Sequence, residues 1–185
     1  MLRKIKNEEL GRISAEDFKR SEKLPVVIIL DNIRSLNNIG SVFRTSDSFR
    51  VEALYLCGIT GSPPHREIQK TALGATESVN WKYFEKVEDA VADLQVKKYQ
   101  IVAIEQIEPH ISLETFSPLS DQKYALIFGN EINGVSESVL GMVDFAIEIP
   151  QFGTKHSFNV AVSAGIVLWH FYFHNQGKSK NKEGC

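Results

Sequence analysis

Apolar runs that recur between helical patterns are the feature that most constrains how this chain can fold. The clearest run is PVVIIL at residues 25–30, and Asp31 follows it directly. A short apolar run without polar alternation is typical of a strand that is buried on both faces of a sheet. This run therefore predicts an interior strand that other elements cover on both sides.

Further runs repeat this pattern along the chain, and helical patterns separate them. Strands are predicted at 52–58, 79–84, 99–105, 123–129 and 144–150, and helices at 38–50, 64–73, 87–98, 136–142 and 157–174. Strands that alternate with helices indicate a mostly parallel sheet with helices on both faces. The sequence therefore predicts an α/β fold.

The chain of 185 residues has the length of one domain. We expect a charged helical extension at 1–24, the α/β domain at 25–175 and a disordered tail at 176–185. No apolar run is long enough to span a bilayer, and the N-terminus is too polar for a signal peptide. Two cysteines, Cys57 and Cys185, cannot form a disulfide framework, so we expect a reduced, cytoplasmic setting and no membrane contact.

The charge of the chain leaves its partner open. A formal net charge of −2 argues mildly against a nucleic-acid partner, because proteins that bind nucleic acids usually carry a basic surface. That argument concerns the average charge only. Lysines and arginines gather in the first 23 residues and again at 178–182, so a local basic surface is compatible with the sequence.

In an open parallel sheet, ligands bind beyond the carboxyl ends of the strands. The loop at 31–40 follows such an end and leads to Asn38, a natural N-cap for the next helix, and to Arg44, away from the apolar side of that helix. Gly40 would leave the backbone open in front of the guanidinium, which suits a phosphate or another anionic oxygen. A capped helix with a solvated arginine is the alternative interpretation.

The loops at 129–135 and 150–158 also follow predicted strands. In the first, Gly129 and Gly134 surround Glu131, which is either exposed to solvent or a partner for a cation such as Arg44. After the second, Ser157 and Asn159 open the last helix; capping accounts for Ser157 and leaves Asn159 in need of another partner. No Walker loop and no G-x-G-x-x-G dinucleotide fingerprint occurs in the chain.

Taken in order, the stretches NNIGSVFR, FGNEINGV and IEIPQFGTKHSFNVAVS resemble the three motifs of the SpoU (TrmH-type) RNA ribose 2′-O-methyltransferases of the SPOUT superfamily. The resemblance runs from Val26 to Trp169 and includes KTALGATE at 70–77. It implies a C-terminal part threaded as a trefoil knot and S-adenosylmethionine bound by the knotted loops. It also implies a homodimer with the last helix in the interface and the active site near the subunit boundary.

The resemblance also assigns roles to individual residues. The residues matching catalytic positions are Asn38, Arg44, Glu131, Ser157 and Asn159, and those matching cofactor contacts are Gly129, Ile149, Phe158 and, at the end of the fourth strand, Ile104. Arg44 is expected to orient the ribose hydroxyl, contact the neighbouring phosphate and stabilise the developing alkoxide. Phe158 departs from the family pattern, in which leucine is usual. No metal is expected, and His170 and His174 lack a third ligand of suitable spacing.

The short basic extension resembles that of the enzymes which methylate a guanosine ribose in the D-loop of tRNA, so tRNA is the favoured substrate. A ribose of ribosomal RNA is the alternative, and a non-catalytic RNA-binding module of the same fold is a second one. A nicotinamide oxidoreductase would fit the α/β pattern, but the chain lacks the glycine fingerprint that binds its cofactor.

Overall fold

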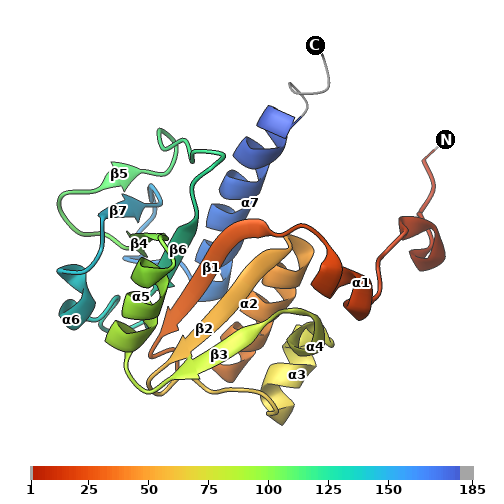
Figure 1. Cartoon of the computed structure of the whole chain (residues 1–185), viewed down its shortest axis with the longest axis horizontal. Coiled ribbons are helices and arrows are strands. Elements are labelled where there is room, and N and C mark those ends of the chain that lie inside the picture. Colours follow the sequence, from red (N-terminus) through yellow and green to blue (C-terminus); the bar gives the residue numbers. More distant parts are fainter. Residues whose placement is uncertain (1, 180–185) are drawn as a thin grey trace.

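The computed structural model describes residues 2–179, and its elements are shown in Figure 1. The strands are β1 Leu24–Asp31, β2 Val51–Cys57, β3 Trp81–Phe84, β4 Gln100–Ile104, β5 Ile111–Ser112, β6 Tyr124–Phe128 and β7 Phe145–Glu148. The helices are the 3-10 helix η1 Asn7–Leu10 and the α-helices α1 Ala15–Arg20, α2 Leu36–Ser48, α3 Arg66–Ala72, α4 Ala75–Ser78, α5 Val87–Val96, α6 Glu137–Leu140 and α7 Val160–Ser179.

The strands form one seven-stranded sheet in the order β3-β2-β1-β6-β4-β7-β5. Every neighbouring pair of strands is parallel, which confirms the predicted α/β class and parallel sheet. The sequence did not predict β5, because two residues are too few to show any periodicity. This short strand pairs with β7 at one edge of the sheet.

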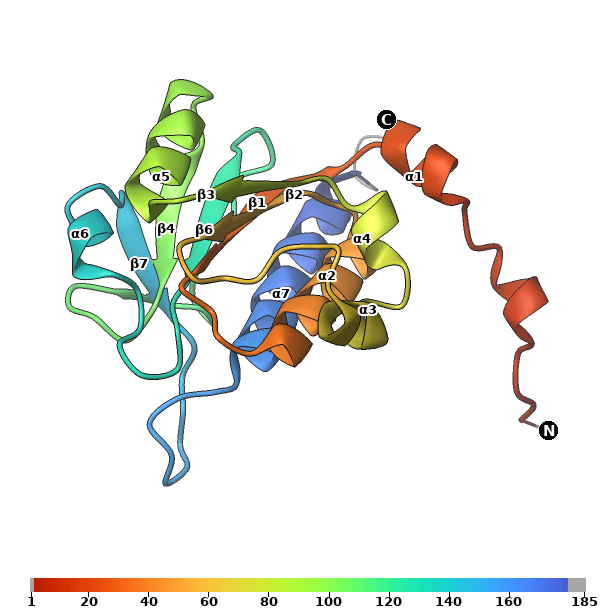
Figure 2. The same ribbon diagram turned by 90° about the horizontal axis from the view of Figure 1, so that it is seen from below.

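Helices cover both faces of the sheet, as Figure 2 shows with α5 and α6 on one side and α2, α3 and α7 on the other. Alternate residues of β1 explain the division, because Ile28 packs in the cluster of buried side chains that α2, α3 and α7 complete. Its neighbour Ile29 packs in the second cluster, under α5 and α6. Both side chains are fully buried, as expected for a strand covered on both faces.

Two predicted helix caps are wrong by three and two residues. The N-cap of α2 is Ser35, whose hydroxyl oxygen accepts a hydrogen bond from the backbone N–H of Asn38 at 3.3 Å. The N-cap of α7 is Asn159, whose Oδ1 accepts from the N–H of Ala161 at 2.9 Å, so Ser157 lies in the preceding loop. Serine and asparagine are both favourable caps, and the periodic pattern alone does not choose between candidates one turn apart.

Gly40 does not open the backbone toward an anion, as the sequence analysis had expected. A Cβ atom at this position would lie 2.1 Å from Oγ1 of Thr71 and 2.3 Å from the carbonyl oxygen of Ile68. Gly40 therefore lets α3 pack directly against α2, and Thr71 completes the contact by donating to the carbonyl oxygen of Asn37 at 3.0 Å. Its role is in packing two helices.

The N-terminal segment carries the short helices η1 and α1 and extends away from the sheet in both views (Figures 1 and 2). Phe18 is the buried residue of α1 and joins the core. At the other end, α7 runs to Ser179, so the first residues of the tail predicted as disordered at 176–185 continue the helix, since no proline interrupts it there. Residues 180–185 lie outside the described part. Among residues 2–179, no helix is long and apolar enough to cross a membrane.

Candidate cofactor pocket and ribose site

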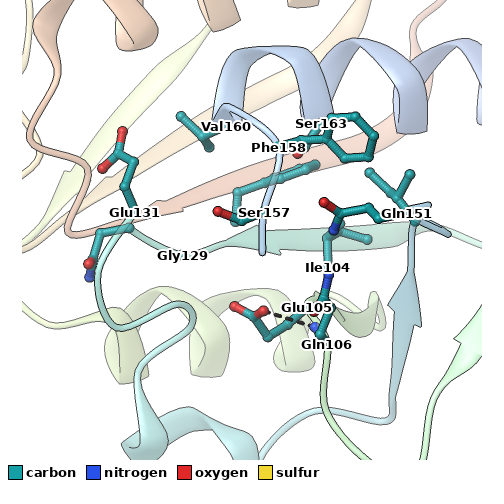
Figure 3. A pocket seen from close by; sticks show the side chains of 13 residues that line it. Ile104, Glu105, Gln106, Gly129, Glu131, Gln151, Ser157, Phe158, Val160 and Ser163 are labelled. Carbon is teal, nitrogen blue, oxygen red and sulfur yellow. Dashed lines mark hydrogen bonds between the residues drawn. The ribbon is translucent and has the colours of Figure 1, made fainter. Parts of the chain in front are cut away.

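A pocket lies beyond the carboxyl ends of β4, β6 and β7, where a parallel sheet is expected to bind its ligand (Figure 3). The empty space in and around it is about 570 Å³, part of which is open solvent at the mouth. The lining residues are Ile104, Glu105, Gln106, Phe128, Gly129, Asn130, Glu131, Ile149, Gln151, Ser157, Phe158, Val160 and Ser163. Three loops far apart in sequence therefore share one hollow.

All four residues that the resemblance assigned to the cofactor line this pocket: Ile104, Gly129, Ile149 and Phe158. Phe158 is 39% exposed, so its ring remains available at the mouth of the pocket. Figure 3 places Ser157 and Phe158 on one side of the hollow and Glu105 on the opposite side. The arrangement agrees with the predicted grouping of these residues.

A chain of hydrogen bonds joins three of the predicted catalytic residues beside the pocket. The side-chain amide of Asn38 donates from Nδ2 to Oε1 of Glu131 at 3.0 Å. The amide of Asn159 donates from Nδ2 to Oδ1 of Asn38 at 3.1 Å. Because the carboxylate of Glu131 only accepts, it fixes the orientation of the Asn38 amide, and that amide in turn orients Asn159. Asn159 thus has the partner that capping alone did not supply.

A tight turn built from glycines and Asn130 places Glu131 where it bonds to Asn38. Oδ1 of Asn130 accepts from the N–H groups of Ile132 and Asn133 at 3.0 and 2.9 Å, and Gly134 adopts a φ of 66°. A Cβ atom on Gly129 would lie 1.9 Å from the carbonyl carbon of Gly134. The turn therefore closes tightly, and Glu131 stands exposed at its tip.

A buried carboxylate ties the first loop to the same turn region. Asp31, at the end of β1, is fully buried, and its Oδ2 accepts from the backbone N–H of Ser136 at 2.7 Å. Its Oδ1 accepts from the side-chain amide of Asn32 at 2.8 Å. These bonds hold the loop after β1 against the loop after β6, so Asn38 and Glu131 meet on a fixed frame.

The other two predicted catalytic residues are placed differently. Ser157 lines the pocket, and within residues 2–179 its hydroxyl makes no hydrogen bond. Arg44 lies on α2, exposed, outside the pocket lining, and its guanidinium has no hydrogen bond or ion pair to any described residue. The alternative that Glu131 pairs with Arg44 is therefore wrong for the described part of the chain, since Glu131 binds Asn38 instead.

Several pocket residues were not predicted from the sequence. Glu105 and Gln106 directly follow β4, and Gln151 lies three residues after the end of β7. Their position just beyond strand ends was the one feature of the sequence that could have indicated them. Ser163 and Val160 lie on α7, where they appeared to be ordinary helix residues. Only the packing of α7 over the pocket brings them to its wall.

The thiol of Cys57 and the imidazole of His170 could react chemically, but both lie in packed regions of the protein. Burial raises the pKa of the Cys57 thiol to about 12, so the thiol stays protonated at neutral pH. Burial also lowers the pKa of His170, whose Nε2 lies 2.7 Å from the carbonyl oxygen of Phe116. In the described part of the chain, no group of three or more His, Cys, Asp or Glu side chains could hold a metal ion.

The fold and the pocket are typical of α/β proteins that bind a small ligand at the carboxyl edge of the sheet. Residues 25–169 match the model of the SpoU rRNA Methylase family. A tRNA (guanosine(18)-2′-O)-methyltransferase of Aquifex aeolicus is 31% identical over 171 residues, which cover 89% of this chain and 76% of that protein. An enzyme of the same description from Borreliella burgdorferi is 27% identical over 165 residues, covering 89% of this chain and 73% of that protein.

Solved structures agree on the fold. The A. aeolicus TrmH/SpoU tRNA modifying enzyme matches with a TM-score of 0.77 at 23% identity, covering 89% of this chain and 82% of that one. An AdoMet-bound rRNA methyltransferase from Sinorhizobium meliloti matches with a TM-score of 0.74 at 23% identity, covering 83% of this chain and 60% of that one.

The chain belongs to the SpoU methylase family of S-adenosylmethionine-dependent RNA methyltransferases. This confirms the family, the enzyme class and the cofactor that the sequence predicted.

The pocket suits this cofactor chemically. Ile104, Phe128 and Ile149 offer apolar surface for a base, and the nearby glutamine and serine side chains offer hydrogen bonds for sugar hydroxyls. Two carboxylates, Glu105 and Glu131, complement a cation.

Two substitutions of Asn159 separate its structural bond from its bond to Asn38. Asn159→Asp keeps the capping oxygen for the N–H of Ala161 and loses the donor to Asn38, so we expect the free energy of unfolding to change by less than about 0.5 kcal/mol. Turnover should fall by about 10- to 100-fold, because the amide chain loses its orientation. Asn159→Ala should lose the same turnover and also about 1 kcal/mol of stability.

Denaturant unfolding and a methyl-transfer assay measure both quantities. Asn159→Asp with full activity would show that the bond to Asn38 does not contribute to the reaction.

Proposed function

We propose that this protein is an S-adenosylmethionine-dependent RNA 2′-O-ribose methyltransferase whose favoured substrate is a guanosine ribose of tRNA. The observation that carries the proposal is the hydrogen-bonded chain of Glu131, Asn38 and Asn159 at the cofactor pocket. A protein that only bound RNA would have no need for a pocket and an oriented polar chain side by side. The relatives described as tRNA (guanosine(18)-2′-O)-methyltransferases support tRNA guanosine as the target.

The pocket residues would hold the cofactor, which supplies an electrophilic methyl group when bound. Backbone groups of Gly129 and Ile149 and the ring of Phe158 would contact it, and the apolar end of β4 at Ile104 would exclude water from one side. Asn38, Asn159 and Ser157 would fix the ribose next to the methyl group. Their amide and hydroxyl groups match the donors and acceptors of a sugar.

Arg44 would act on the ribose hydroxyl and the neighbouring phosphate. Its positively charged guanidinium would donate hydrogen bonds and stabilise the developing alkoxide. Its exposure and its lack of a partner among the described residues leave it free for an anionic substrate. We also propose a cytoplasmic location, since the buried Cys57 is a free thiol.

The test is transfer of a labelled methyl group from S-adenosylmethionine to unmodified tRNA and, separately, to ribosomal RNA, followed by nucleoside analysis. We expect 2′-O-methylguanosine in tRNA. Arg44→Ala should lower turnover by about 100- to 1000-fold, because a charged donor to the alkoxide is lost. The Kd for S-adenosylmethionine should stay within about twofold, because Arg44 lies outside the pocket lining.

Label in ribosomal RNA alone would retain the chemistry and replace the substrate. Bound cofactor with no label in either RNA would support the non-catalytic binding module. Equal loss of turnover and cofactor binding in Arg44→Ala would contradict the role given to Arg44.

We also infer a homodimer built on α7. The side chains of Val162, Trp169 and Phe173 are 50%, 59% and 63% exposed and lie along one stripe of this apolar helix. Exposed apolar stripes of this kind mark interaction surfaces. α2 ends beside this stripe, since the ring centroid of its C-cap residue Phe49 is 6.3 Å from that of Trp169. A dimer through α7 would therefore bring the subunit boundary close to the helix that carries Arg44.

Trp169→Glu should convert the dimer to a monomer, because the interface would bury an unpaired carboxylate at a cost of several kcal/mol. Light scattering after size-exclusion chromatography measures the mass. Val96→Glu on α5 is the matched control, since Val96 is 84% exposed on the other face of the sheet and should leave the mass unchanged. A native chain that is monomeric at high micromolar concentration would refute the dimer.

We propose that the C-terminal part is threaded as a trefoil knot. The path of the chain is compatible with it. β7 lies beyond β4 in the sheet, whereas α7, which follows β7, packs against α2. Stretching the unfolded chain from both ends in an optical trap tests it. A knotted chain stays shorter than its contour length of about 3.3–3.6 Å per residue, and full extension would rule the knot out.

A further inference from the structure

Glu105 is the first residue after β4, and it links two walls of the pocket. Its backbone N–H donates to the carbonyl oxygen of Ile147 at 3.1 Å, which continues the sheet. Its Oε2 accepts from the N–H of Val135 at 3.2 Å, and its Oε1 accepts from the N–H of Gln106 at 2.8 Å. The carboxylate therefore bonds to the loop after β6 and to the loop after β4 at once.

The loop after β6 is shaped to receive this carboxylate. A Cβ atom on Gly134, where φ is 66°, would lie 2.2 Å from Oε2 of Glu105, so a side chain at this position would displace the carboxylate. The same turn carries Gly129 and Glu131, which line the pocket. The position of the Glu105 carboxylate therefore fixes where these two residues stand.

The charges in the pocket lining are all of one sign. Glu105 and Glu131 are its only charged side chains, and no lysine, arginine or histidine is part of the lining. Within residues 2–179, neither carboxylate forms an ion pair; Glu131 accepts from an amide and Glu105 from backbone N–H groups. Arg44 on α2 and Lys155 in the loop before α7 also lie outside the lining.

We propose that Glu105 is a positioning residue with two effects. It holds the loop after β6 in the shape that binds the cofactor, and its negative charge makes the pocket prefer the sulfonium form of the cofactor over the uncharged thioether left after methyl transfer. The proposal rests on the proposed function, since it takes the pocket as the cofactor site. Preference for the charged form would help the spent product to leave.

Two variants separate the effects. Glu105→Gln removes the charge and keeps one of the two accepting oxygens, so it can retain the bond from the N–H of Val135 and loses that from the N–H of Gln106. The ratio of affinities for S-adenosylmethionine and S-adenosylhomocysteine should fall by about 3- to 10-fold, because the charge is lost. Glu105→Asp keeps the charge and shortens the side chain by one methylene, so it should weaken both ligands by a similar factor and leave the ratio unchanged. If Glu105 had only a structural role, the ratio of the two affinities would be the same in Glu105→Gln and Glu105→Asp.

Isothermal titration calorimetry of the full chain measures both affinities, and circular dichroism verifies that each variant is folded. Glu108→Gln is the matched control, because it removes one charge from the same loop, outside the pocket lining, and should change neither affinity. An unchanged ratio in folded Glu105→Gln overturns the charge effect. An unchanged affinity in Glu105→Asp overturns the positioning effect.

The native protein provides a measurement that does not depend on any variant. It should bind S-adenosylmethionine more tightly than S-adenosylhomocysteine, and a ratio at or below one overturns the proposal. Failure of the native protein to bind either ligand would instead refute the assignment of the pocket. The two failures are therefore distinguishable.

Discussion

The parallel register of β6 between β1 and β4 is the constraint on which the site depends. Phe128 of β6 pairs with Leu30 of β1 on one side and with Ile104 of β4 on the other. The strands therefore end at the same level, and the residues that follow them emerge side by side. The buried Asp31 then joins the loops after β1 and β6, and Glu105 joins those after β4 and β6. Both links use a carboxylate that accepts from backbone N–H groups.

Because these loops are held together, the polar side chains of Glu131, Asn38 and Asn159 have fixed orientations. Glu131 can only accept, so the amides of Asn38 and Asn159 are oriented in sequence, and the second amide also caps α7. Catalysis by positioning needs this kind of order, since a ribose hydroxyl must be in line with the methyl group it attacks. Arg44 lies outside the hydrogen-bonded chain and the pocket lining, and under the proposed function it would supply the positive charge that the lining lacks.

The sequence predicted the elements better than their ends or their contacts. Uninterrupted apolar runs such as PVVIIL predicted strands buried on both faces, and the sheet confirmed them. Asn38 and Ser157 were wrong as caps, because Ser35 and Asn159 are equally suitable caps about a turn or less away. The residues that the motifs assigned to the cofactor lie together in the lining of one pocket, and their roles stay predictions. The bond between Asn38 and Glu131 spans 93 residues, and that between Glu105 and Val135 spans 30. Such contacts depend on strand order, which periodicity does not encode.

The most direct test of this account is a crystal structure of the protein grown with S-adenosylhomocysteine. The account predicts density for the ligand in the pocket beyond β4, β6 and β7, against Ile104, Gly129 and Ile149, with the chain from Glu131 through Asn38 to Asn159 intact beside it. Ligand bound elsewhere on the chain, or a bound state in which that hydrogen-bonded chain is broken, would contradict it.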